Sequence, residues 1–250
     1  MRRFFINSEQ AACGTEKGYI DIIGSDVRHI IGVLRMRAGD PLVLTSSDGR
    51  DFYCELAESE PERVRVRVKE IKVNTTEPRV DVTLIQGVPK GDKMELIIQK
   101  NVELGVSRIV PVLTEFTVVR LDGKDCEKKQ ARWQKISGEA AKQCGRGAVP
   151  EVEMPAGLEV ALKAIPDGTL RWFAYENERD TTFKQLLTGA GADYCGRIAV
   201  LIGAEGGFSA AEAALAEQYG FVPFTLGSRI LRTETAGIAV LAGMRCFFED

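Results

Sequence analysis

The amino-terminal part of the chain shows the hydrophobic pattern of a small β-rich domain. Apolar and polar residues alternate over short runs between about residue 4 and residue 72, most strictly over residues 64–68. An Asp48-Gly49 pair between two such runs is typical of a tight turn. We therefore expect a small β-barrel over residues 1–73.

A single helix is expected within this domain, because apolar residues recur there at helical spacing. These residues are Val27, Ile30, Ile31 and Leu34. Ser25 or Asp26 precedes them as the amino-terminal cap. Arg28 and Arg35 then share the outer face, where they either contact phosphate groups or form a solvated surface. We interpret His29 as structural.

Residues 74–79 lack periodicity and predict a linker, after which strand and helix patterns alternate over residues 79–250. Strands are expected over residues 80–86, 108–113, 170–175, 198–202 and 221–226. Helix starts are indicated where Asp92 precedes Glu95, and Ser209 precedes Glu212, at capping-box spacing. A last helix over residues 233–248 is apolar on more than one side. This alternation predicts an α/β domain with a parallel sheet covered by helices.

Two glycine-bearing segments carry the candidate chemistry. Residues 201–209 read Leu-Ile-Gly-Ala-Glu-Gly-Gly-Phe-Ser, and residues 226–236 read Leu-Gly-Ser-Arg-Ile-Leu-Arg-Thr-Glu-Thr-Ala. Each follows an expected strand and precedes an expected helix, so glycine leaves the backbone open to a ligand at a strand end. A tight turn with positive φ would explain the first segment alone. Together they predict one cofactor site formed by Ile202, Gly203, Glu205, Gly206, Leu226, Gly227, Ile230, Leu231, Thr235 and Ala236.

Arg232 and Glu234 lie within the second segment, and charged residues rarely enter a buried segment unless they are paired. They either pair with each other or act on a ligand. The motifs of other common sites are missing: there is no G-x-G-x-x-G, no G-K-[ST] after Gly87 and no G-x-S-x-G. Dinucleotide, P-loop and hydrolase sites are therefore disfavoured.

Composition bears on localisation, metal binding and RNA binding. No apolar run approaches the roughly 20 residues that cross a bilayer, so we expect a cytoplasmic protein. Six cysteines without a C-x-x-C spacing, and a single histidine, indicate free thiols and no metal site. A net charge of −3 argues against RNA binding through a broadly basic surface, so any RNA contact must be local.

The two segments resemble the signature of the RsmE family of SPOUT-class methyltransferases. That family reads Gly-Pro-Glu-Gly-Gly-Phe-Ser and Leu-Gly-x-Arg-Ile-Leu-Arg-x-Glu-Thr-Ala, and within these segments only Ala204 departs. Further matches lie at residues 28–35, 90–94, 103–106 and 140–146, so the resemblance spans the chain. Phe116 stands where the family commonly has arginine.

The resemblance implies S-adenosylmethionine as cofactor and N3 of a uridine in 16S ribosomal RNA, within the small ribosomal subunit, as methyl acceptor. It also implies a PUA-like RNA-binding domain at the amino terminus, a deep trefoil knot in the SPOUT domain, and a homodimer with the cofactor site near its interface. Arg146 could cap the carboxyl end of a helix, but its place in the family's Gln-x-x-Arg pattern predicts contact with substrate RNA or the neighbouring subunit. Arg28 and Arg35 become candidates for RNA binding.

For this reaction Arg232 is the candidate that stabilises negative charge on uracil once N3 loses its proton. Glu234 either accepts that proton or orients Arg232. Because pairing and stacking hide N3, the target must be single-stranded or flipped out. Two other functions stay open: a SPOUT methyltransferase for another RNA such as tRNA, and a ribosome-assembly factor without catalytic activity.

Overall fold

The computed structural model describes residues 1–118 and 123–249, which form two compact units. The N-terminal unit comprises Met1–Glu77 with Ala141–Val149, and the C-terminal unit comprises Pro78–Ala140 with Pro150–Asp250. The boundary after Glu77 falls within the expected linker. The sequence pattern gave no sign that residues 141–149 belong with the first unit.

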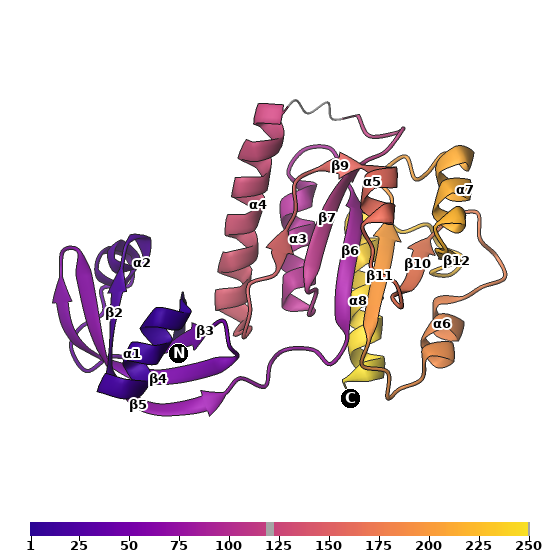
Figure 1. Ribbon diagram of the computed structural model, residues 1–250. Helices are drawn as coiled ribbons and strands as arrows, with labels where there is room; N and C mark the ends of the chain where they lie inside the picture. Colours follow the sequence, from indigo (N-terminus) through magenta and orange to yellow (C-terminus); the bar gives the residue numbers. More distant parts are fainter. Residues whose placement is uncertain (119–122, 250) are drawn as a thin grey trace. The chain divides into compact units, whose positions relative to one another are not determined.

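The N-terminal unit is built on a five-stranded sheet with the strand order β1-β3-β4-β5-β2 (Figure 1). Strand β1 is parallel to β3, and the other neighbours are antiparallel. Its elements are β1 (Arg2–Ile6), α1 (Ser8–Lys17), β2 (Tyr19–Ile23), α2 (Ser25–Arg28), the π-helix η1 (His29–Val33), β3 (Pro41–Ser46), β4 (Arg50–Glu60) and β5 (Arg63–Val73).

One hydrophobic core serves all five strands of this unit. Phe4 of the edge strand β1 and Ile20 of the opposite edge strand β2 lie in the same buried cluster as Leu42 and Phe52. Val64 and Val66, from the strictly alternating run, also point inward. Both edges of the sheet therefore bury side chains in one interior, as the expected barrel requires.

Two features of this unit differ from the sequence-based expectation. Helix α1 was not expected, because its buried face holds only small residues such as Ala11. Asn7 caps it, accepting a hydrogen bond from the Gln10 backbone N–H at 2.8 Å. Helix α2 begins after Gly24, whose φ is 77°, and neither Ser25 nor Asp26 caps it.

The expectation that Arg28 and Arg35 share one helix face is wrong. The helical turns end at Leu34, and Arg35 follows with a left-handed backbone of φ 51°. Both arginine side chains are exposed, but they leave the chain in different local conformations.

The C-terminal unit contains an all-parallel sheet of seven strands with the order β12-β10-β11-β6-β7-β8, in which β9 also pairs with β7. Its elements are β6 (Asp81–Gly87), α3 (Lys93–Glu103), β7 (Arg108–Leu113), α4 (Gly123–Cys144), β8 (Glu151–Val152), β9 (Ala156–Gly157), α5 (Leu158–Lys163), β10 (Leu170–Ala174), α6 (Phe183–Ala190), β11 (Arg197–Ile202), α7 (Ala210–Gln218), β12 (Val222–Phe224) and α8 (Thr233–Phe248). The last residues of α4, from Ala141, are grouped with the N-terminal unit. The predicted parallel sheet with helices between its strands is confirmed.

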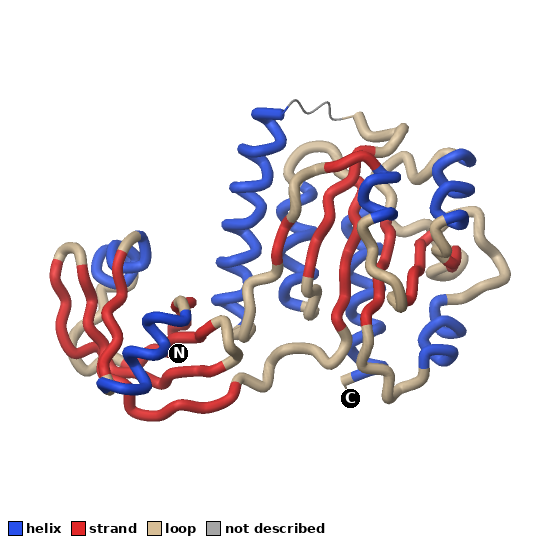
Figure 2. The backbone as a smooth tube through the Cα atoms, viewed as in Figure 1, coloured by secondary structure: helices blue, strands red, loops and turns tan. Residues whose placement is uncertain are grey.

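Helices cover both faces of this sheet (Figures 1 and 2). Helices α5 and α7 pack on the face that presents Ile85, Phe173 and Leu201. Helix α8 packs against α3, α6 and β11 on the other face, where the Phe183 ring meets Trp172. Because strand residues alternate between faces, continuous apolar strands are what a sheet covered on both sides requires.

Of the two predicted capping boxes, one is confirmed and one is wrong. Ser209 caps α7 in a complete capping box with Glu212, as predicted. Asp92 does stand at the amino-terminal cap of α3, but its side chain makes no capping hydrogen bond, so the capping box predicted there is wrong. Glu95 forms an ion pair with Arg132 instead, at 2.6 Å.

Candidate functional site

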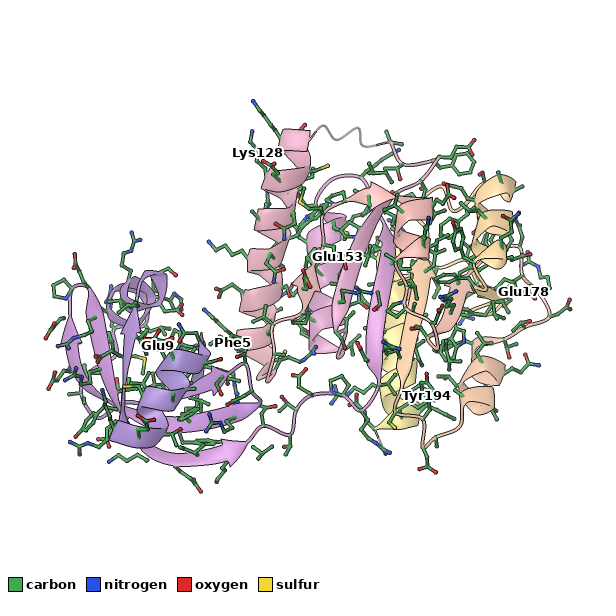
Figure 3. The ribbon with its side chains drawn as sticks, viewed as in Figure 1. Phe5, Glu9, Lys128, Glu153, Glu178 and Tyr194 are labelled. Atoms are coloured by element: carbon green, nitrogen blue, oxygen red, sulfur yellow. The ribbon has the colours of Figure 1, made fainter. Side chains whose placement is uncertain are left out.

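The candidate site lies at the carboxyl-terminal edge of the parallel sheet. Tyr194, which precedes β11, marks the opposite edge (Figure 3). Strands β6 and β11 are neighbours, and they end in register at Gln86 and Ile202. A Cβ added to Gly87 would lie 2.9 Å from the Gly203 carbonyl carbon and closer still to the Ala204 nitrogen. The first glycine segment therefore packs directly on the end of β6.

A buried hydrogen-bond network joins the first glycine segment to the second. The Gln86 amide donates to the Thr233 hydroxyl at 2.9 Å, and that hydroxyl donates to the Gly203 carbonyl at 2.6 Å. Gln86 is fully buried and Thr233 is 6% exposed. The network places the start of α8 against the loop after β11, so the two segments meet as predicted.

Lys93 connects both segments by charge. Its ammonium lies 2.8 Å from Glu205 Oε1 and 3.7 Å from Glu234 Oε2. Burial raises the pKa of Glu205, but hydrogen bonds from Lys93 and from the Lys90 N–H outweigh it, so the pKa of Glu205 falls below its ordinary value. The hydrogen bond to Glu205 raises the pKa of Lys93. Both groups are therefore charged at neutral pH.

Arg232 and Glu234 do not pair with each other. Arg232 stands at the amino-terminal cap of α8 with its side chain exposed, and within residues 1–118 and 123–249 its guanidinium makes no ion pair. Glu234 is largely buried, and its Oε2 atom has no hydrogen-bond partner among the described residues. The Lys93 ammonium, 3.7 Å away, offsets part of the cost of burying this charge, and the oxygen can still accept a proton or a hydrogen bond from a ligand. Arg232 and Glu234 are therefore both available to act on a ligand.

The second segment also presents apolar surface and open backbone. Ile230 is 87% exposed, and Leu226 and Leu231 are half-buried. Gly227 has φ 109°, and no atom lies within 4 Å of the position that a Cβ would take. Exposed aliphatic side chains beside accessible backbone are suited to a flat heteroaromatic group.

The other predicted cofactor residues fall into two groups. Ile202 and Ala236 are buried, so their side chains belong to the core beneath the site and are not on its surface. Gly203 packs on Gly207, while Thr235 is exposed on the first turn of α8.

Sequence reasoning missed several side chains of this site. Gln86, Lys93 and Thr233 link its loops, and the Glu176 carboxylate lies against Gly207. Two signals could have found them: a glutamine within an apolar strand, and polar residues directly after the parallel strands β6 and β10.

The structure does not place Arg146 on a surface. Its side chain is 5% exposed, and its guanidinium binds Glu77 through contacts of 2.6 and 2.9 Å. Burial raises the pKa of Glu77. The pairing with Arg146 and the hydrogen bonds from backbone donors such as the Gly147 N–H have the larger effect, so the pKa of Glu77 lies below its ordinary value. The expected contact of Arg146 with RNA or a neighbouring subunit is therefore corrected to a structural ion pair within the N-terminal unit.

We expect Arg146→Ala to lower the free energy of unfolding by about 1–3 kcal/mol at pH 7, because Glu77 loses its partner while staying partly buried. A carboxylate with a depressed pKa stabilises the fold above its unfolded pKa, and this stability is lost as pH falls through the folded pKa. The difference between wild type and variant should therefore shrink in acid. Urea unfolding at pH 7 and at acidic pH measures it, with exposed Arg37→Ala as control. A difference independent of pH would contradict the assignment.

The N-terminal unit contains a separate open groove of about 490 Å³. Its charged lining residues are Glu55, Glu58, Arg65 and Arg67, and Tyr19 lies beside Arg67. The acidic and basic groups balance, so this groove is not an anion site. The predicted cofactor residues lie at the sheet edge of the other unit.

Side chains that could ligate a metal ion are scattered over the part of the chain that the structure describes. There, no group of three or more His, Cys, Asp or Glu side chains is arranged to hold an ion. All six cysteines are free thiols. Among the same residues, no helix is both long and apolar enough to span a bilayer.

Comparison with known proteins identifies the family. The RNA methyltransferase domain model matches residues 76–245, and the RNA methyltransferase PUA domain model matches residues 22–69. The chain belongs to the RNA methyltransferase family that includes ribosomal RNA small subunit methyltransferase E. The predicted PUA-like domain followed by an α/β methyltransferase domain is thereby confirmed.

The relatives match over almost their whole length. Ribosomal RNA small subunit methyltransferase E of Bacillus subtilis is 35% identical over 249 residues, covering 98% of this chain and 96% of the relative. The Buchnera aphidicola (Schizaphis graminum) protein of the same name is 32% identical over 234 residues, covering 92% of each chain. The crystal structure of this methyltransferase from Neisseria gonorrhoeae, bound to S-adenosyl methionine, superimposes with a TM-score of 0.84 at 32% identity, covering 99% of this chain and 98% of the other. The trefoil knot, the domain limits of 1–73 and 79–250, and the individual site residues stay predictions.

Proposed function

We propose that the protein transfers the methyl group of S-adenosylmethionine to N3 of a uridine in 16S ribosomal RNA of the small subunit. The observation that carries this proposal is the joining of both glycine segments at one sheet edge. Beside them lie Arg232, which has no ion-pair partner among the described residues, and the largely buried Glu234, whose Oε2 accepts no hydrogen bond there. The Neisseria gonorrhoeae relative with its bound S-adenosyl methionine supports it.

The residues at this edge fit such a cofactor. Leu226, Ile230 and Leu231 offer an aliphatic surface for the adenine ring, and the open Gly227 backbone admits close approach. The loop that contains Gly203, Glu205 and Gly206 would hold the other side. When bound, the cofactor supplies a methyl group on a positively charged sulfur.

Arg232 and Glu234 have separate roles toward the acceptor base. The uracil N3–H is weakly acidic, so it must lose its proton at or before the attack. Glu234, whose Oε2 lies 3.7 Å from the Lys93 ammonium and accepts no hydrogen bond among the described residues, accepts this proton directly or through water. The exposed Arg232 guanidinium then donates to the uracil oxygens, where negative charge develops. Holding the reactants in line contributes up to about 7–11 kcal/mol more.

We propose that the N-terminal unit selects the RNA while the sheet edge of the C-terminal unit performs the transfer. Recognition would be local, since the chain has a net charge of −3. Because ribosomes are the substrate, the protein would work in the cytoplasm, and family membership favours a homodimer. Light scattering of the purified protein tests the homodimer directly.

If Arg28 and Arg35 contact phosphates, the double replacement by alanine should weaken RNA binding across sequences. The log–log slope of affinity against salt should become shallower by about one unit per lost contact, because each contact releases counterions. Cofactor affinity should not change. Binding to small subunits at several salt concentrations measures the slope, and exposed Arg37→Ala serves as control. An unchanged slope would show that both residues belong to a solvated surface and contact no phosphate.

The proposed activity is tested by offering several RNAs to the protein. Labelled S-adenosylmethionine is incubated with the protein and with small subunits, free 16S RNA or tRNA from cells that lack the enzyme. Label in small subunits supports the proposal. Label in tRNA alone would favour another SPOUT methyltransferase, and no label in any RNA would favour an assembly factor without catalytic activity.

A further inference from the structure

Phe116 is an exposed aromatic residue that lies against the first glycine segment of the candidate site. It lies in the loop after β7, and 45% of its surface is exposed. A Cβ added to Gly206 would lie 2.6 Å from the Phe116 Cβ and 3.2 Å from its Cγ. Its side chain therefore rests on the first glycine segment, next to Glu205, which binds Lys93.

The loop that carries Phe116 is held in place on both sides. The Thr114 N–H donates to the Thr117 hydroxyl at 2.9 Å. The Glu115 N–H donates to Glu212 Oε1 at 2.8 Å, and Glu212 in turn caps α7 by accepting from the Ser209 N–H at 3.0 Å. The loop is thus tied to the helix that follows the first glycine segment, so the Phe116 side chain is presented at a fixed point.

The hydrophobic core does not account for this placement. Phe116 belongs to neither of the two buried clusters named above, and Gly206, against which it lies, has no side chain to pack on it. The exposed part of the Phe116 ring is accessible to a ligand. Such a ring is suited to the flat face of an unpaired base, since base–aromatic stacking stabilises complexes and needs no sequence-specific hydrogen bond.

We propose that Phe116 stacks on the target uracil after the base leaves its own stack in the RNA. The inference rests on the proposed function, because it requires a flipped or single-stranded uracil beside Arg232 and Glu234. Phe116 would replace the lost base stacking and hold the ring while Glu234 and Arg232 act on N3 and the oxygens. Phe116 is therefore assigned as a substrate-binding residue.

The test compares non-aromatic and aromatic replacements at this position. Phe116→Leu keeps apolar bulk over Gly206 but removes the π-face, whereas Phe116→Tyr keeps the ring. We expect Phe116→Leu to lower kcat/KM for small subunits by about 5- to 140-fold, the loss that one base–aromatic stack entails. Phe116→Tyr should stay close to wild type. S-adenosylmethionine affinity, measured by calorimetry, should be the same in all three proteins.

The outcomes separate this inference from the proposed function. If wild type methylates small subunits and Phe116→Leu does so equally well, the stacking role is overturned while the proposed function stands. If Phe116→Tyr loses as much activity as Phe116→Leu, or if cofactor affinity falls with kcat/KM, the ring only shapes the loop and the inference fails. Absence of methyl transfer by wild type would overturn both. Phe116→Met repeats the comparison should Phe116→Leu fold poorly.

Discussion

Replacing Arg232 with alanine should lower the maximal rate of methyl transfer by about 100- to 1000-fold, the usual cost of losing one donor to a developing anion. Its guanidinium is exposed and has no ion-pair partner within the described part of the chain, so the replacement removes no structural pairing. The negative charge on uracil exists only as the reaction proceeds. Cofactor affinity should therefore change by no more than about twofold.

Single-turnover kinetics with saturating cofactor measures this rate, and calorimetry measures cofactor affinity. Arg229→Ala is the matched control, because Arg229 is an exposed arginine in the same segment. A variant of Arg232 that binds cofactor poorly but reacts at the normal rate once saturated would place this residue in the cofactor site instead.

Gly87→Ala should abolish or strongly weaken cofactor binding, although Gly87 lies outside both glycine segments. The new methyl group would enter the backbone of Gly203 and Ala204, which cannot give way as a flexible side chain can. Overpacking of this kind costs about 1–3 kcal/mol or more and displaces the backbone around it. The first glycine segment would move off β6 and away from the second.

Thermal unfolding and cofactor calorimetry on the same preparations test this expectation. Gly157→Ala is the control, because a Cβ at Gly157 meets no atom within 4 Å and its φ of −67° suits any residue. Cofactor affinity equal to wild type in a folded Gly87→Ala protein would show that the contact between β6 and the first segment does not shape the site.

The sequence pattern predicted the parts of the fold that local chemistry determines. The strand over residues 108–113 and the helix over residues 233–248 have the expected limits, because apolar periodicity and flanking polar residues specify them. Ser209 and Glu212 likewise lie near each other along the chain, so their spacing alone indicated the cap. Helix α1 was not predicted, because its buried face consists of small residues and gives a weak hydrophobic pattern.

The site was predictable only in part. Glycine segments after strands are visible in the sequence, and their meeting could be expected from a parallel sheet. The sequence marks Gln86 and Lys93 as polar residues in and after a strand, but it does not show their partners, since these contacts depend on β6 standing next to β11 in the sheet order. For the same reason Arg146 resembled an RNA-binding residue until its partner Glu77 was placed beside it.

The most direct test of the central claim is to identify the methylated atom. Small subunits from cells lacking the enzyme are treated with the protein and S-adenosylmethionine, and the digested 16S RNA is analysed by mass spectrometry against nucleoside standards. Phe116, Arg232 and Glu234 are proposed to act on a uracil that reacts at N3, so we expect 3-methyluridine at one position. Methyl groups found on a ribose oxygen, on a base carbon or on another base would contradict it.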